Sequence, residues 1–415
     1  MFRESLRRVA KYESLYARPT QHAELDVIMP LLAYRFFRKP KLQILLTNYT
    51  LQETRDKPDT ICQIMRLLWP KSIRSRLFNQ FKEFENFLIA VGKRDHFLHQ
   101  FLVFLLGLNV IQALLQKYRD KSDRERVFKF KDERYIFYTW LMTATAHDFG
   151  YPIEVASDIS YKLSTLYKVF GMRNFSKSFG LLRHKPEVAE ENDFDKIEIG
   201  KASSMSPVRS KYELDINHVL RNQLCSTLRI RKDRADKLLH RLKERLDHGY
   251  IGAIILSSTV LKSHLSYCKG NWDQVQSSKL YRALQAAIAA IAIHNFQYKR
   301  DRKIINLESN FYAYLLYLVD NIQDWSRSSV AVGEWPKYWL CSFERKDKDL
   351  RIDVGYHLYH HSWTKLMEKR VNKGLRKKKE AIASLQPPPE PLGMTIAVKY
   401  NSSHPKINET LEHTF

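Results

Sequence analysis

An adjacent histidine and aspartate give this chain of 415 residues its clearest chemical signal. His147 and Asp148 stand in the segment TATAHDFGYP, and four more residues of metal-ligating type bracket them at wide intervals: His99, His248, His294 and Asp320. One carboxylate can bridge two cations that imidazoles from other helices hold. These six residues therefore predict a hydrolytic site with two metals.

The expected roles differ between the members of this set. We expect Asp148 to bridge the two metals and His147 to complete the coordination of one, so that these two residues are the catalytic pair. Asp320 would close the first metal site, and His248 and His294 would hold the second. The nucleophile would be a hydroxide derived from water, and manganese, magnesium or iron would suit such ligands.

Helices must bring these residues together. Successive positions are separated by 48, 100, 46 and 26 residues, which permits one ligand per helix of a bundle. Glycine is scarce and apolar residues recur at spacings of three and four, so we expect a mainly α protein. The predicted helices are 23–37, 60–68, 73–91, 95–118, 133–147, 215–225, 233–246, 249–267, 279–294 and 309–325.

Acidic residues near the candidate ligands could themselves bind metal, or could hydrogen-bond a ligand histidine as outer partners that do not touch the metal. Asp320 lies in the apolar segment YLLYLVDNIQDW, where an unpaired carboxylate is costly to bury, so ligation is favoured. Asp324, one turn further on, is a candidate for a hydrogen bond to a ligand histidine. Asp247, directly before His248, is a weaker candidate of the same kind.

The order His, His-Asp, His, His, Asp resembles the HD superfamily of metal-dependent phosphohydrolases. The phrases RDHFLHQFLVFLLG, HDFGYP, DHGYIGAIIL and YLVDNIQDW look more narrowly like bacterial HD domains of the conflict and signalling type. The resemblance covers about residues 95 to 325. It implies an HD-type helical bundle, and it favours His99 over His96 as the first ligand, because Val103 fits the family's phrase. His96 would then be a polar neighbour or a phosphate contact.

The resemblance also has a departure. Many relatives that cleave cyclic dinucleotides carry a phosphate-binding lysine two residues after the His-Asp, and here Gly150 stands there. Another cation must take that role, and Lys93, Arg94 and Arg327 are placed in sequence to do so. The tripeptide Gly-Tyr-Pro that follows is no evidence for cyclic di-GMP hydrolysis, because it lies elsewhere in the relatives named for it.

The composition bounds the partners and the compartment. A formal charge of +24 attracts phosphate-bearing molecules, so nucleotides, nucleic acids and anionic lipid surfaces are all possible partners, while plain solvated helix faces explain the charge equally well. The scattered cysteines form neither a disulfide framework nor a zinc ribbon. With no signal peptide and no membrane-spanning segment expected, we predict a cytoplasmic protein with reduced thiols and leave its oligomeric state open.

Three parts are predicted along the chain. Residues 1–92 form a helical N-terminal extension, residues 93–328 the HD domain with a mobile insertion at 175–211, and residues 329–415 a small basic α+β appendage. In the appendage, strands are expected at 338–345, 349–357 and 394–400, with a basic helix, EKRVNKGLRKKK, between the last two. That helix could bind phosphate backbones or simply be solvated.

The function that follows is hydrolysis of a nucleotide or nucleic-acid phosphoester by water that two metals activate. Two alternatives remain open. The same ligand order occurs in di-iron oxygenases of the superfamily, and the chain could instead be a nucleotide or nucleic-acid binding module with a vestigial metal site.

Overall fold

A computed structural model gives the positions of most of the chain. It describes residues 40–51, 57–69, 96–169, 196–198, 213–295, 305–324, 337–346, 350–359, 363–385, 390–402 and 407–415. The predicted helices 23–37 and 73–91, the cations Lys93, Arg94 and Arg327, and most of the predicted insertion lie outside the described residues.

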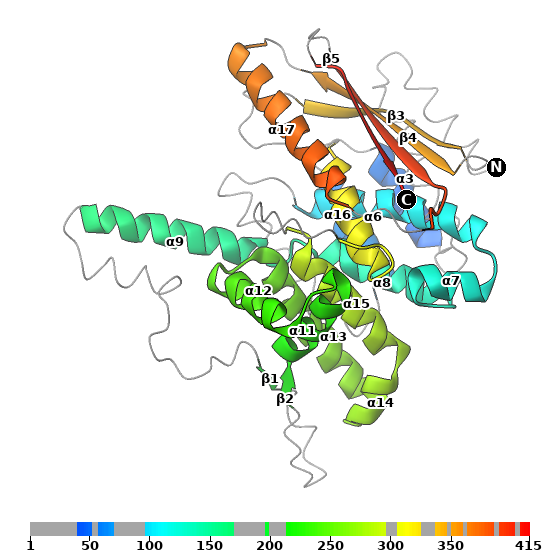
Figure 1. The fold of residues 1–415 in the computed structure, drawn as a ribbon, viewed down its shortest axis with the longest axis vertical. Coiled ribbons are helices and arrows are strands. Elements are labelled where there is room, and N and C mark those ends of the chain that lie inside the picture. The colour runs from blue at the N-terminus through cyan, green and yellow to red at the C-terminus, as the bar shows by residue number, and fades with distance from the viewer. Residues whose placement is uncertain are drawn as a thin grey trace.

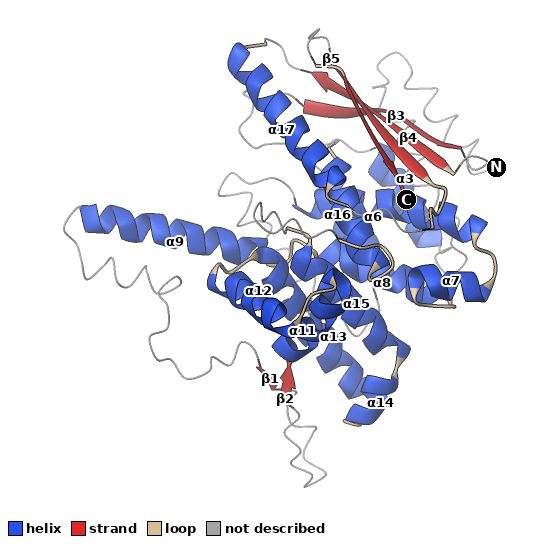
Figure 2. Ribbon diagram, in the orientation of Figure 1, coloured by secondary structure: helices blue, strands red, loops and turns tan. Residues whose placement is uncertain are grey.

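The expected fold class is confirmed, because the protein is mainly α-helical with a small C-terminal sheet (Figures 1 and 2). The longer helices are α3 (Pro40–Leu51), α4 (Lys57–Leu68), α6 (His96–Lys117), α7 (Lys121–Phe128), α8 (Glu133–Ala146), α9 (Tyr151–Val169), α11 (Ile216–Leu228), α12 (Lys232–Glu244), α13 (His248–Tyr267), α15 (Lys279–Ile293), α16 (Phe311–Ile322) and α17 (Lys365–Ala383). A short helix, α14 (Trp272–Ser277), precedes α15.

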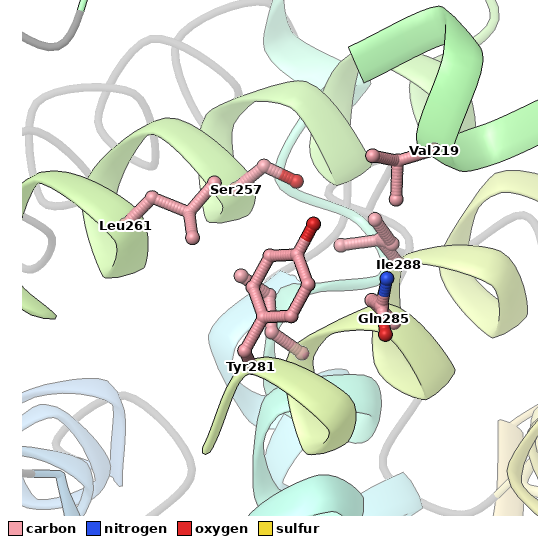
Figure 3. Close-up of a pocket in the computed structure, with 7 residues that line it drawn as sticks. Val219, Ser257, Leu261, Tyr281, Gln285 and Ile288 are labelled. Carbon is pink, nitrogen blue, oxygen red and sulfur yellow. The ribbon is translucent and has the colours of Figure 1, made fainter. Parts of the chain in front are cut away.

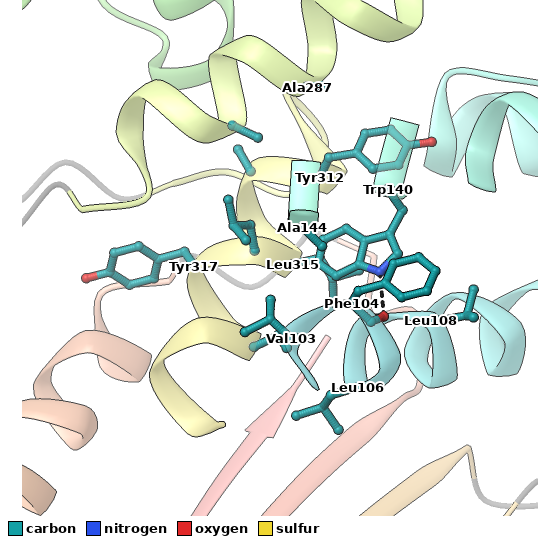
Figure 4. Packing of buried hydrophobic residues seen from close by; sticks show 14 of the residues in the cluster. Val103, Phe104, Leu106, Leu108, Trp140, Ala144, Ala287, Tyr312, Leu315 and Tyr317 are labelled. Atoms are coloured by element: carbon teal, nitrogen blue, oxygen red, sulfur yellow. Dashed lines mark hydrogen bonds between the residues drawn. The ribbon is translucent and has the colours of Figure 1, made fainter. Parts of the chain in front are cut away.

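Helices α6, α8, α15 and α16 form the centre of the bundle, and their apolar side chains make one continuous core. Figure 4 shows Trp140 of α8 stacked against α6, with its indole nitrogen donating to the Phe104 carbonyl oxygen at 2.9 Å. Helix α6 is apolar and long enough to cross a bilayer, but 94% of the qualifying stretch is buried inside the protein. It is accordingly a core helix, and its polar residues His96, His99 and Asn109 are buried with it.

Side-chain caps fix where the helices that carry the candidate ligands begin. Asp132 accepts from the Arg134 amide before α8, and Asn310 accepts from the Ala313 amide before α16. Asp247 accepts from the amides of Gly249 and Tyr250, so the residue considered as an outer partner starts α13 instead. An N-cap of this kind satisfies amides that have no partner inside the helix.

The C-terminal sheet has the order β3-β4-β5-β6, from strands Lys337–Lys346, Arg351–Tyr359, Thr395–Ser402 and Glu409–Thr414. Its outer pairs are antiparallel, while β4 and β5 are parallel and are joined through α17. Parallel neighbours need such a crossover, because a tight turn cannot join them. The first three strands follow the prediction, and β6 was not predicted.

Further elements differ from the sequence prediction, which placed no helix at α3, α7 or α14. Helix α9 was not predicted, and among its first ten residues only Pro152, Val155 and Ser157 are buried, so no long apolar stripe announces it. Strand β1 (Lys196–Glu198) falls inside the segment predicted as a mobile loop, and it pairs antiparallel with β2 (Glu213–Asp215).

A buried polar contact joins the sheet and α17 to the bundle. The Lys378 ammonium donates to the Asn321 carbonyl oxygen at 2.6 Å and to the Asp324 carboxylate at 3.0 Å. The Tyr400 hydroxyl of β5 donates to the same carboxylate at 2.9 Å. The last turn of α16 is therefore held by α17 and β5 together.

The small pocket of Figure 3 lies between α11, α13 and α15. The Tyr281 ring stands among Val219, Ser257, Gln285 and Ile288, which line it. Its free space of about 10 Å³ is at the lower limit of what one ordered water needs, about 10–15 Å³. It is a packing gap and offers no room for a substrate.

Acid should destabilise the protein partly through His413 of β6. Burial lowers the pKa of His413 to about 4, and its Nε2 accepts from the buried Tyr314 hydroxyl. An unfolded histidine has a pKa near 6.5, so between pH 6.5 and 4 the unfolded chain binds a proton that the folded chain excludes. The free energy of unfolding should therefore fall as the pH drops through this window, by about 3 kcal/mol from this residue.

Urea unfolding at pH 7.5 and pH 4.5 measures this contribution. The loss of stability on acidification should be smaller in His413→Gln than in the unaltered protein. An identical loss in both would show that His413 does not exclude the proton.

Candidate metal centre

The structure brings all six expected ligands to one place in the bundle. His99 lies in the first turn of α6, His147 directly follows α8, His248 begins α13, and His294 directly follows α15. Asp148 lies in the turn after α8, and Asp320 lies in the last turn of α16.

The two carboxylate oxygens of Asp148 face different pairs of histidines. Its Oδ2 lies 3.8 Å from Nε2 of His99 and 3.5 Å from Nε2 of His147. Its Oδ1 lies 3.6 Å from Nε2 of His248 and 3.7 Å from Nε2 of His294. Two overlapping triads that share Asp148 result, and together they could hold one or two metal ions.

Asp320 adjoins the first triad and marks its open edge. Its Oδ1 lies 2.9 Å from Nε2 of His99 and 3.9 Å from Nε2 of His147. The Asp320 side chain is 23% exposed, whereas that of Asp148 is 5% exposed. The Glu154 side chain beside the second triad is 30% exposed, so the cluster has a partly exposed carboxylate next to each triad.

All four histidines of the triads have Nδ1 bound to an acceptor. His147 and His294 each donate to a backbone carbonyl three residues earlier, Ala144 at 2.8 Å and Ile291 at 2.6 Å. His99 donates to Oε1 of Gln323 at 2.7 Å. His248 donates to Oε2 of Glu154. Fixing Nδ1 as the protonated nitrogen leaves Nε2 as the ligand atom, as in metal sites whose histidines have outer partners.

These tautomers make the ring arrangement unfavourable without a positive charge. Nε2 of His99 lies 3.4 Å from Nε2 of His147, and Nε2 of His248 lies 3.1 Å from Nε2 of His294. Two neutral rings that donate through Nδ1 would point lone pairs at each other across these gaps. A metal ion that accepts both lone pairs removes the conflict, as a proton on one Nε2 also would, and the donor set fits a metal in each triad.

Two residues that bind ligand histidines, Glu154 and Gln323, were not predicted from the sequence. Glu154 lies in the first turn of α9, a helix that was not predicted, so nothing placed it near His248. Gln323 lies beside Asp324, which was the expected partner of a ligand histidine, and the amide takes that role on His99. Asp324 accepts hydrogen bonds from Lys378 and Tyr400.

The structure also places His96 and His99, of which the sequence resemblance favoured His99 as the first ligand. His99 joins the first triad, and His96 lies one turn earlier with its Nδ1 2.9 Å from Oδ2 of Asp148. The His96 ring packs against Tyr151 at a tilt of 35°, with 4.3 Å between ring centroids, and Tyr151 also meets His248 edge-on. His96 thus fixes the rotation of the shared carboxylate.

Charge and burial set the protonation states at the centre. Burial alone would raise the pKa of Asp148, but His147, His294 and His96 outweigh it and hold that pKa well below the usual range. Burial lowers the pKa of His147. Burial also opposes charge on His248, but the bond to Glu154 and the field of Asp148 prevail and raise its pKa to about 9. A cation at this histidine must therefore compete with a proton.

Gly150 permits the close approach that assembles the second triad. A Cβ at this position would lie 2.2 Å from the His248 carbonyl oxygen and 2.8 Å from Cβ of Ile251. Neither backbone nor a branched side chain can retreat easily within a packed helix. Gly150 therefore has a steric role in bringing the turn after α8 against the start of α13.

Removing Glu154 should weaken the second triad selectively. Loss of an outer hydrogen-bond partner typically lowers metal affinity by about 10- to 100-fold, so Glu154→Ala should do the same for one of two bound ions. Isothermal titration with Mn²⁺ would resolve a weakened ion beside an unchanged one. Asp158→Ala, which removes a carboxylate from the next turn of the same helix, is the control and should leave both affinities intact. Equal weakening of both ions in Glu154→Ala would contradict the separation into two triads.

The cations expected to contact phosphate, Lys93, Arg94 and Arg327, lie outside the described residues. Comparison with known proteins adds no family, because no family model, no curated protein and no solved structure matches this chain. What the geometry shows is a mainly helical protein with a buried His/Asp cluster that resembles a metal site.

Proposed function

We propose that this protein is a metal-dependent phosphohydrolase of the HD type that uses two metal ions to activate water. One observation carries the proposal: four Nε2 atoms converge in pairs on the two oxygens of Asp148, with every Nδ1 anchored by an acceptor. A paired donor set that shares one carboxylate suits two cations a few ångströms apart.

The residues divide the work between binding and orientation. His99, His147 and Asp320 would hold the first ion, His248 and His294 the second, and Asp148 both. When bound, two such metal ions would act as Lewis acids that lower the pKa of water and offset negative charge developing on a phosphoryl group. Glu154, Gln323 and His96 keep the rings and the bridging carboxylate in place, so little reorganisation is needed during the reaction.

Burial strengthens the site's electrostatics. The side chains of the four triad histidines are at most 10% exposed, so water is excluded from most of the cluster. Charges there act through a medium of low dielectric constant. The carboxylates of Asp320 and Glu154 are partly exposed, at 23% and 30%, so solvent meets the cluster at these two residues. A net charge of +24 favours a substrate that carries phosphate, and we propose a nucleotide or a nucleic-acid phosphoester.

Metal-loaded protein and a panel of phosphoesters test the proposal. Protein supplied with Mn²⁺, Mg²⁺ or Fe²⁺ should bind up to two ions and hydrolyse bis(p-nitrophenyl) phosphate, a nucleoside phosphate or a short oligonucleotide. Chelation should stop the reaction, and added metal should restore it. Oxygen consumption by iron-loaded protein without ester hydrolysis would contradict the proposal in favour of an oxygenase.

A further inference from the structure

Helix α17 carries far more positive than negative charge. Its eight cationic residues are Lys365, Lys369, Arg370, Lys373, Arg376, Lys377, Lys378 and Lys379, against only Glu368 and Glu380. Lys378 is 14% exposed and is used inside the protein, where it pairs with Asp324. Seven cationic side chains are left on the outer surface of one helix, about 28 Å long at 1.5 Å per residue.

Four of these lysines follow one another at intervals of four residues. We call Lys365, Lys369, Lys373 and Lys377 the lysine ridge, and all four are exposed. Helical residues four apart lie one above the other, so the ridge places an ammonium group about every 6 Å along the helix. Among the described residues, no ridge lysine forms an ion pair.

The ridge stands opposite the face by which α17 packs on the protein. Val371, Leu375 and Ile382 are buried on that face. At about 3.6 residues per turn, Lys373 projects roughly half a turn away from Val371. The ridge therefore faces outward along its whole length.

Stability of the helix gives no reason for this arrangement. Like charges four residues apart repel each other and destabilise a helix. Lysines near the first turn also oppose the helix dipole. A polyanion lying along the ridge would turn these repulsions into attractions, which favours a binding role over simple solubility.

A nucleic-acid strand fits the ridge better than a membrane does. A helix that lies on a lipid surface needs an exposed apolar face, and the apolar face of α17 is buried, with only Leu366 strongly exposed at 56%. A strand presents regularly spaced phosphates, and lysines bind phosphates as point charges without reading bases. The His/Asp cluster is almost wholly buried, and a flexible single strand can approach a buried centre more easily than a rigid duplex can.

The helix is also attached to the metal centre. Lys378, directly after the ridge, bonds to the Asn321 carbonyl oxygen, and Asn321 directly follows Asp320. A single strand of nucleic acid bound along the lysine ridge would therefore pass close to the last turn of α16, which carries Asp320. Figure 1 shows α17 projecting from this contact away from the bundle.

We infer that the lysine ridge of α17 binds the sugar-phosphate backbone of single-stranded nucleic acid, without sequence preference. Its use for substrate capture rests on the proposed function, whereas the binding itself does not. Counterion release from each phosphate contact on a single strand changes the salt slope of log K by about 0.7. Loss of three ridge lysines should therefore reduce the slope by about 2.

The test measures binding of the full chain to a fluorescein-labelled 20-nucleotide strand, as DNA and as RNA, in EDTA at 50 to 200 mM salt. Lys369→Gln/Lys373→Gln/Lys377→Gln should weaken binding on the order of tenfold or more at 50 mM salt and flatten the slope as stated. The control, Lys121→Gln/Lys262→Gln/Lys269→Gln, removes the same charge from exposed positions outside α17 and should bind like the unaltered protein.

Three results would overturn the inference. Equal weakening in both triple variants would show that only net charge matters. Unchanged binding in the ridge variant would place the contact elsewhere, and binding to phosphatidylserine vesicles but not to the oligonucleotides would assign the ridge to membranes. Because EDTA removes metal and turnover from the measurement, loss of the proposed hydrolysis and loss of the ridge are seen separately.

Discussion

Asp148→Asn is expected to abolish paired metal binding and with it any phosphoester hydrolysis. Asp148 is the only residue shared by both triads, and each of its oxygens lies 3.5 to 3.8 Å from two imidazole nitrogens. The amide keeps the shape but loses the negative charge, and its nitrogen cannot ligate. Loss of a residue that hydrogen-bonds a metal ligand lowers metal affinity by about 10- to 100-fold, and loss of the shared ligand itself should lower it further. Activity should fall below detection.

Metal content after dialysis and calorimetric titration with Mn²⁺ measure this effect. Asp236→Asn, which removes a surface charge from α12 where Asp236 pairs with Arg221, is the matched control and should bind two ions normally. Asp320→Asn should weaken only the ion at His99 and His147. Retention of two tightly bound ions in Asp148→Asn would remove the basis of the proposed function. Circular dichroism would establish that each variant is folded.

Gly107→Ala is expected to destabilise the core strongly. A Cβ on Gly107 of α6 would lie 2.0 Å from Cζ2 and 2.5 Å from Cε2 of Trp140. Trp140 is fully buried and its indole nitrogen is held by the Phe104 carbonyl, so the ring cannot withdraw without losing that bond. Overpacking of this kind costs about 1–3 kcal/mol and occasionally more, and we expect about 3 kcal/mol or more here.

Gly374→Ala is the matched control for that substitution. Gly374 also lies inside a helix, but a Cβ there would meet nothing within 4 Å. Without a clash, alanine should stabilise the helix by about 0.5–1 kcal/mol through its lower conformational entropy in the unfolded chain. Urea unfolding followed by tryptophan fluorescence compares the two variants. A similar effect from both would show that α6 and α8 can separate at little cost.

The sequence predicted the helical class because burial of apolar residues imposes a period that is visible along the chain. The helices predicted at 133–147 and 279–294 end within one residue of α8 and α15. Elements with a weak period were missed: α9 has few buried residues near its start, and β6 is a six-residue strand. The division into three parts and the cytoplasmic location stay predictions.

For the candidate metal centre, the sequence predicted the ligands but not the residues that hold them in place. Residue types and spacing were enough to nominate His99, His147, Asp148, His248, His294 and Asp320, because few side chains bind metals and these stand in helical contexts. The sequence could not predict that Glu154 binds His248 and that Gln323 binds His99, since hydrogen bonds between distant helices leave no local pattern. The expected role of Asp324 was assigned one residue away from Gln323 for the same reason.

The sequence by itself determined the kinds of atoms available for chemistry and the helices that carry them, since both depend on residue identity and on neighbours a few positions away. Only the tertiary structure decided that the two oxygens of Asp148 face separate histidine pairs and that each Nδ1 is anchored. Those facts depend on how closely helices approach. Contacts such as Gly150 against the His248 carbonyl set that approach between segments about a hundred residues apart, where no periodicity reaches.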